Sequence, residues 1–253
     1  MRTALVRRTV LTASAVSLAL LATACGGEKT DAKASASAPA TSAAPAAKGK
    51  TDAELGGVIV VQADLPAYLV KAATAEEVAA AGAVTSDKPE CAPLVKAQSM
   101  APVGTAAGLA RTKAVALGKE PAANASAEEK LKAGLDALGA TATSVTLTSY
   151  DGKGAEEAFA ALKTAGTACA GGYTGSQQGE SLTITKVSPG ASVTGGDEAL
   201  AYTIAADGDG TKIGMELVVV RKGNTLATFS AISLSGTAEQ PKPVVDAQVK
   251  KLG

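Results

Sequence analysis

The sequence contains no histidine, and only three cysteines occur among its 253 residues. It therefore lacks the imidazole that Ser-His-Asp triads, HExxH sites and His-ligated zinc or haem require. The patterns G-x-S-x-G, S-x-x-K, G-x-G-x-x-G and the P-loop are also absent. Carboxylate-pair chemistry stays open, since it has no sequence signature. We predict a protein that is not an enzyme and that holds no cofactor and no metal.

Aromatic residues are also scarce, with four Tyr, two Phe and no Trp. Val, Leu, Ile and many Ala must therefore fill the interior. Because Ala buries little surface, and apolar burial contributes about 25 cal/mol per Å², we expect a modest stability per residue.

The only long apolar run lies at the N-terminus. Arg2, Arg7 and Arg8 form a basic start, and residues 9–24 carry no charge. This run is shorter than the roughly 20 residues of a membrane-spanning helix, and a basic start before it is typical of a secretory signal. We therefore predict a signal peptide over residues 1–24. The Arg7-Arg8 pair leaves export by the twin-arginine pathway as an alternative to export by the general secretory (Sec) pathway.

The signal ends in Leu21-Ala22-Thr23-Ala24-Cys25-Gly26, which resembles a lipobox. Cleavage before Cys25 and lipidation of its thiol would supply at least two acyl chains, enough for stable membrane attachment. The alternative is an ordinary signal cut after Ala24, with a chance cysteine behind it. We expect a lipoprotein on the outer face of a bacterial cytoplasmic membrane.

The charge balance argues against nucleic acid as a partner. Removing three Arg from 24 basic residues leaves 21 against 24 acidic ones, a net charge of −3. Nucleic-acid binding needs a basic stripe, which an acidic mature chain does not offer. The membrane, through the lipid, is the expected partner.

Two cysteines remain once Cys25 is lipidated. In an oxidising compartment, we predict a Cys91–Cys169 disulfide, with two buried free thiols as the alternative. Closing a loop of about 78 residues would stabilise the fold by roughly 4–5 kcal/mol in the chain-entropy model.

The composition divides the mature chain into a tether and a domain. Residues 25–51 begin with the lipidated cysteine and continue with Ala, Ser, Pro, Lys and Gly without apolar periodicity, which predicts a disordered tether reaching roughly 30 Å. Residues 52–253 are predicted to form one folded domain.

Helix signals dominate the first half of that domain. Capping boxes at Thr74 and Ser126 open helices that Gly82 and Gly139 end, the second with Leu131, Leu135 and Leu138 along it. Further helices are expected over Pro89–Met100, with Cys91, Leu94, Val95 and Gln98 on one face, over Gly154–Cys169, and over Pro243–Leu252, with Val245, Val249 and Leu252 buried.

Strand signals dominate the second half. Alternating patterns predict strands over 143–150, 181–187, 198–206, 212–221 and 225–234. Short Gly/Asn/Asp loops join the last three, as they do antiparallel neighbours. The fold class is therefore α+β: an antiparallel sheet with a C-terminal meander, packed by several helices and carrying one disulfide.

Three residues are candidates for ligand binding. Arg221 ends an apolar strand, where it would either reach solvent or clamp an anion at the rim of a cleft. Tyr68 and Tyr202 would either pack in the core or stack on a ligand.

Several short motifs resemble a known family. These are Asp64-Leu65-Pro66-Ala67-Tyr68, Pro89-Glu90-Cys91-Ala92-Pro93-Leu94, the run from Ala155 to Cys169, Gly196-Asp197-Glu198-Ala199, and Val218 to Asn224. Over residues 57–253 the chain is similar to actinobacterial lipoproteins with an extracellular sensor-like domain of the PknH type. The resemblance implies an antiparallel sheet with packed helices and a cleft for a small ligand. Members of that type often carry two disulfides, whereas this chain can form one.

We therefore expect a non-catalytic cell-surface lipoprotein, monomeric, with a ligand-binding or sensor-like domain. A carrier of a lipid or other apolar molecule is the first alternative, and it needs a large apolar cavity. An envelope protein-interaction module is the second, and it needs an exposed apolar patch.

Overall fold

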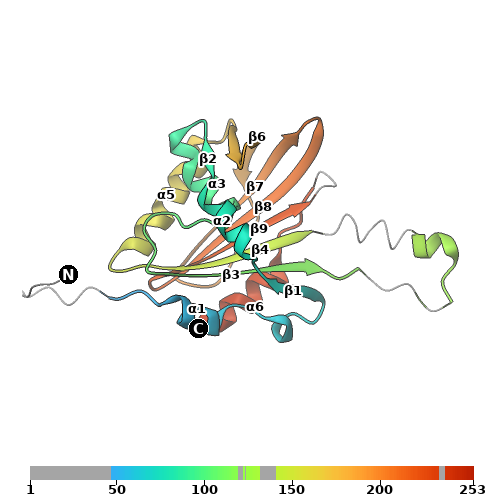
Figure 1. Ribbon diagram of the computed structural model, residues 1–253, viewed down its shortest axis with the longest axis horizontal. Coiled ribbons are helices and arrows are strands. Elements are labelled where there is room, and N and C mark those ends of the chain that lie inside the picture. Colours follow the sequence, from blue (N-terminus) through green and yellow to red (C-terminus); the bar gives the residue numbers. More distant parts are fainter. Residues whose placement is uncertain (1–46, 119–121, 123, 132–140, 234–236) are drawn as a thin grey trace, which may run out of the picture. The chain divides into compact units, whose positions relative to one another are not determined.

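Nine strands of the described residues pair into one sheet, in the order β1-β3-β4-β9-β8-β7-β6-β5-β2, and all neighbours are antiparallel (Figure 1). The computed structural model describes residues 47–118, 122, 124–131, 141–233 and 237–253. The strands are β1 (Tyr68–Ala72), β2 (Thr85–Ser86), β3 (Gly108–Ala116), β4 (Ala142–Ser149), β5 (Tyr173–Gln177), β6 (Glu180–Pro189), β7 (Glu198–Gly208), β8 (Thr211–Lys222) and β9 (Thr225–Ser233).

Helices flank this sheet on both faces. They are α1 (Asp52–Val58), α2 (Ala75–Gly82), α3 (Ala92–Gln98), α5 (Gly154–Ala168) and α6 (Lys242–Leu252), with the short 3-10 turns η1 (Gln62–Asp64) and η2 (Pro89–Cys91). The predicted class, an α+β fold with an antiparallel sheet, several helices and one disulfide, is confirmed.

The C-terminal meander is the regular part of the sheet. Strands β5 to β9 follow one another in space as in sequence, joined by two-residue turns except between β6 and β7, where residues 190–197 form a longer loop. Asp209 and Gly210 take positive φ angles of 52° and 84° in one turn, and Gly223 takes 55° in another. Such turns match the right-handed twist of antiparallel neighbours. The strands expected over residues 181–234 correspond to β6 to β9.

The two faces of the sheet carry separate hydrophobic cores. On β8, Met215, Leu217 and Val219 face one core, and Val218 and Val220 face the other. Helices α3 and α5 pack on the first face, and α1 and α6 on the second (Figure 1). Because both faces are buried, residues 217–220 of β8 form an unbroken apolar run.

A disulfide joins the helices of the first face. Cys91 at the start of α3 is bonded to Cys169 at the end of α5, with their Cα atoms 5.9 Å apart. Both side chains are buried in the core of that face. The predicted pairing is therefore confirmed.

The helix expected over Pro89–Met100 is interrupted. Residues 89–91 form the 3-10 turn η2, and α3 ends at Gln98, because Met100 takes a positive φ of 60° and the N–H of Ala101 donates to the carbonyl of Lys96. Leu94 and Val95 are buried as expected, while Gln98 is half-buried.

The expected capping boxes are present. Thr74 and Glu77 bond reciprocally at the start of α2, and Ser126 and Glu129 do the same further along the chain. Leu135, Leu138 and Gly139 of the second expected helix lie outside the described residues.

The C-terminal helix buries a polar residue that the sequence pattern does not mark. Gln248 is fully buried, accepting a hydrogen bond from the N–H of Val60 and donating one to the carbonyl of Val58, both at 2.9 Å. It thereby ties α6 to the segment that follows α1. Val245 is buried as expected, whereas Val249 and Leu252 are only half-buried.

Residues 47–51 lie against the end of the sheet. The N–H of Gly49 donates to Asp151 and that of Lys50 to Ser149, both at 2.8 Å, and the carbonyl of Ala47 accepts from Gly152. We expected these residues to belong to the tether, but their backbone groups are satisfied by the folded domain.

We predict that replacing both Cys91 and Cys169 by Ala lowers the free energy of unfolding by about 4 kcal/mol. At roughly 2–4 °C per kcal/mol for a domain of this size, the melting temperature should fall by about 10 °C or more. Calorimetry with and without reductant measures this, and the double variant should not respond to reductant. An unchanged melting temperature would contradict the assigned role of the bond.

Candidate functional site

A cleft of about 380 Å³ opens on the first face, between α3 and the β5–β6 hairpin. Helix α3 and the residue after it supply Val95, Gln98 and Ser99, and the floor comes from four strands. The full lining is Val84, Val95, Gln98, Ser99, Tyr173, Gly175, Ser176, Gln177, Gln178, Glu180, Ser181, Leu182, Ile184, Met215 and Ile232.

Strand register shapes the floor of this cleft. Tyr173 is paired with Ile184 and Gly175 with Leu182, so that alternate residues of β5 and β6 point toward α3. Gly175 has no side chain, and a Cβ at this position would lie 3.6 Å from the methyl groups of Val95. The missing side chain keeps the space between strand and helix open.

A chain of three side chains crosses the inner end of the cleft. The hydroxyl of Tyr173 donates to Oε1 of Gln98 at 2.5 Å, and Nε2 of Gln98 lies 3.6 Å from the sulfur of Met215. Burial raises the pKa of the Tyr173 phenol, which therefore stays a protonated donor. The amide of Gln98 links α3 to β5 and β8.

The disulfide holds both walls of the cleft. Cys91 directly precedes α3, and Cys169 lies four residues before Tyr173. The ammonium of Lys88 also donates to the carbonyl of Gly172 at 2.6 Å. One covalent bond and one hydrogen bond thus fix the helix relative to the strand.

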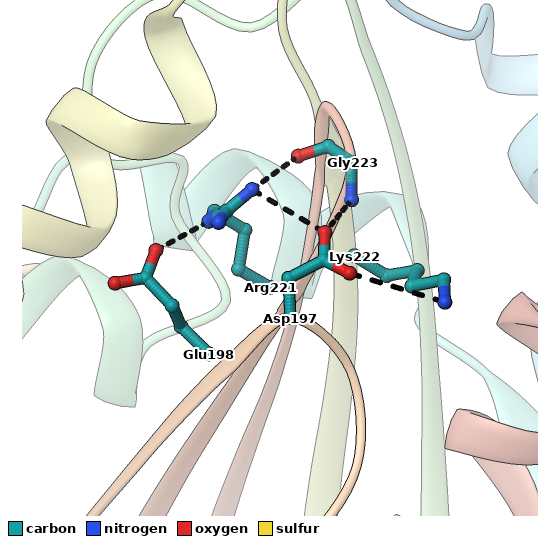
Figure 2. Close-up of polar contacts among 5 residues, drawn as sticks. All are labelled: Asp197, Glu198, Arg221, Lys222 and Gly223. Carbon is teal, nitrogen blue, oxygen red and sulfur yellow. Dashed lines mark hydrogen bonds and ion pairs between the residues drawn. The ribbon is translucent and has the colours of Figure 1, made fainter.

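Arg221, a candidate from the sequence, is engaged within its own hairpin (Figure 2). Its Nε donates to Glu198 at 2.6 Å, and an amino group lies 3.4 Å from Asp197 and 3.2 Å from the carbonyl of Gly223. The side chain is only 15% exposed. Acids from the start of β7 therefore neutralise its charge, and Arg221 does not line the cleft.

Asp197 completes this arrangement. Its carboxylate accepts the N–H of Gly223 at 2.7 Å, and its own N–H donates to the carbonyl of Arg221 at 2.7 Å. Gly196 before it has a positive φ of 68°, and a Cβ there would overlap the Arg221 carbonyl. The cluster fastens the start of β7 to the β8–β9 turn.

The two tyrosine candidates lie on opposite faces of the sheet. Tyr202 belongs to the core of the first face, where its hydroxyl donates to the carbonyls of Leu162 and Lys163 at 3.3 and 3.4 Å. Its ring occupies the space above Gly166 of α5. Tyr68 packs at the margin of the second core. Neither lines the cleft, so the structure does not bring the three candidates together.

The residues that form the cleft carry weak sequence signals. Gln98 stands on the inner face of an otherwise apolar pattern, which is the one feature that sets it apart. Tyr173 and Gly175 come from β5, a strand that the sequence did not predict, because YTGSQ is short and mostly polar.

The chemistry available around the cleft is limited. Among the described residues, no three His, Cys, Asp or Glu side chains are grouped to hold a metal. Glu180 is the one carboxylate in the lining, and neither Lys nor Arg contributes to it. Another acid, Glu216, is buried on the other face of β8, where burial raises the pKa of its carboxyl and Thr203 donates to it at 2.6 Å.

A second cleft, of about 570 Å³, lies beside the start of α5. Small residues of the segment Val103–Ala107 and the exposed Asp151, Lys153 and Glu157 line it. None of the helices in the described part of the chain is long and apolar enough to cross a membrane.

Comparison with known proteins finds distant likeness among solved structures. No protein-family model matches the chain, and no curated protein matches it. Among solved structures, the extracellular domain of PknH from Mycobacterium tuberculosis matches with a TM-score of 0.41 and 12% identity, covering 81% of this chain and 96% of that one. The match is to the type of domain that the sequence motifs suggested, but likeness at this level does not assign a family.

We predict that Gly166→Ala destabilises the domain by about 1–3 kcal/mol, because the added methyl group overlaps the Tyr202 ring. In a Tyr202→Ala background the same change should become stabilising, by up to about 1 kcal/mol, since Ala favours a helix over Gly. Gly171→Ala is the control, because nothing lies within 4 Å of its added Cβ. Chemical denaturation measures all variants, and equal effects of Gly166→Ala in both backgrounds would refute the contact.

Proposed function

We propose that the folded domain is a non-catalytic ligand-binding or sensor-like module that takes a small molecule into the cleft between α3 and the β5–β6 hairpin. The observation that carries the proposal is the cleft itself: about 380 Å³, with apolar side chains on its floor and seven polar residues among the fifteen that line it. This volume lies within the range of about 300–1,000 Å³ that ligand pockets usually have.

The attachment of the cleft walls supports the proposal. The disulfide and the Lys88–Gly172 hydrogen bond hold α3 against β5. A preorganised site binds more tightly because less conformational freedom is lost on binding.

The carrier alternative is less well supported by this cleft. A carrier for a lipid needs a large apolar cavity, whereas this cleft is small and contains Gln98, Gln177 and Glu180. The interaction-module alternative would use the exposed apolar residues near the edge strand β1, such as Leu69 and Leu117. However, the side chain of Gln62 bonds the carbonyl of Tyr68 at 2.7 Å and the N–H of Val70 at 3.0 Å, which closes the outer edge of β1 to a partner strand.

We further propose that the domain works on the outer face of the cytoplasmic membrane, anchored by lipid on Cys25. This part rests on the signal-like N-terminus and on the cysteine that ends it, which lie outside the described residues. The disulfide supports it, because such bonds persist in oxidising compartments. A membrane anchor and one small ligand are the expected partners.

We predict that Gly175→Leu abolishes ligand binding, because its side chain projects toward Val95 and fills the cleft. Native mass spectrometry of protein purified from its own cell envelope should show an added small-molecule mass that Gly175→Leu lacks. Thr174→Leu is the control, since it lies next in the same strand and points to the other face. A lipid-sized mass would favour the carrier alternative. A mass retained by Gly175→Leu would place the ligand elsewhere.

We predict that Cys25→Ser moves the protein from the membrane fraction to the soluble fraction. The serine cannot carry the thioether-linked lipid, so the acyl chains that hold the protein in the bilayer are lost. Detergent phase partitioning and the mass of the mature N-terminus measure the change. A variant that has lost residues 1–24 and still stays in the detergent phase would exclude Cys25 as the anchor.

A further inference from the structure

We infer that the cleft selects uncharged ligands, and that the carboxamide of Gln98 makes this selection by donating a hydrogen bond to a neutral acceptor such as a carbonyl oxygen. The ligand's aliphatic body then lies on Val95, Leu182, Ile184 and Met215. The inference rests on the proposed function, because it concerns the same cleft.

The orientation of the Gln98 amide follows from its two neighbours. The Tyr173 hydroxyl donates a hydrogen bond to Oε1 of Gln98 at 2.5 Å. In the flipped orientation, Oε1 would face the sulfur of Met215 instead, and two acceptors would then oppose each other. The amide therefore directs Nε2 toward Met215, which lines the cleft together with Gln98.

Nε2 has more hydrogen-bonding capacity than its neighbours satisfy. It carries two N–H donors, and among the described residues its recorded partner is the Met215 sulfur at 3.6 Å. A thioether is a weak acceptor, so a carbonyl oxygen from a ligand would be a much better partner.

The charges around the cleft exclude an acid as the ligand. The lining contains neither Lys nor Arg, and Glu180 is exposed at the mouth. A carboxylate or phosphate would lose water without gaining a cation, which is strongly unfavourable. An amide, ester or alcohol on a short aliphatic chain has no such cost.

Three probes with the same chain test this inference: hexanamide, hexanoate and hexylamine, titrated at pH 8 and followed by the side-chain amide NMR signals of the protein. Hexanamide should shift the Gln98 signal and saturate, and hexanoate should bind at least about tenfold more weakly. In Gln98→Glu the order should reverse, with hexylamine gaining and hexanamide losing about tenfold, because a carboxylate accepts where the amide donated. Asn124→Asp, the same amide-to-carboxylate change at an exposed residue outside the cleft lining, should leave the order unaltered.

The outcomes separate this inference from the proposed function. If all three probes bind wild type and Gln98→Glu alike, the cleft binds aliphatic chains without using Gln98, and the inference is overturned while the proposed function stands. A second outcome is that no probe binds, while wild type carries a ligand from the cell envelope that Gly175→Leu does not carry. In that case the inference about Gln98 is wrong, and the proposed ligand-binding function stands. Gln98→Met, which keeps the size of the side chain, must bind hexanamide and hexanoate equally, and this second variant decides the matter if Gln98→Glu fails to fold.

Discussion

The Cys91–Cys169 bond is the constraint on which the first face of the sheet depends. Helix α3 has only seven residues, too few to be stable alone, and aromatic side chains that could bury it deeply are scarce. The disulfide ties its start to the end of α5, the longest helix among the described residues. Val95 and Gln98 lie on α3, after Cys91, and form one wall of the cleft. Tyr173 lies four residues after Cys169 and belongs to the other wall. The bond that stabilises the fold therefore also holds the two walls of the cleft together.

Elsewhere in the described part of the chain, hydrogen bonds and ion pairs of polar side chains connect neighbouring elements. The fully buried side chain of Gln248 joins α6 to the segment after α1 through two hydrogen bonds to backbone groups. Asp197 and Glu198 hold Arg221 at the β8–β9 turn. Such contacts specify position more than they add net stability, since exposed ion pairs contribute little and buried polar groups must first be desolvated. They explain how a core rich in alanine can still hold a defined arrangement.

The candidate site shows why polar residues were hard to rank before the fold was known. Arg221 and Tyr202 stand out in a sequence with few arginines and few aromatic residues, yet both are engaged by neighbours from the protein itself. Gln98 attracts little notice in the sequence, but among the described residues its Nε2 contacts only a weak acceptor, the sulfur of Met215. Unmet hydrogen-bonding capacity is a property of the surroundings, and it becomes visible only when the partners are in place.

The sequence by itself determined the features that depend on neighbouring residues. Alternation over residues 181–233 with Gly/Asp turns predicts β6 to β9, the apolar stripe from Ala155 to Cys169 predicts α5, and the lack of histidine removes whole classes of chemistry. Only the tertiary structure decided that β1 and β3 pair, that β2 pairs with β5 at the far edge, and that Gly175 leaves a cleft beside Val95. These features bring together residues that are distant in the chain. A short polar segment such as β5 forms a strand because a neighbouring strand supplies its hydrogen bonds, and not because its own side chains favour a strand.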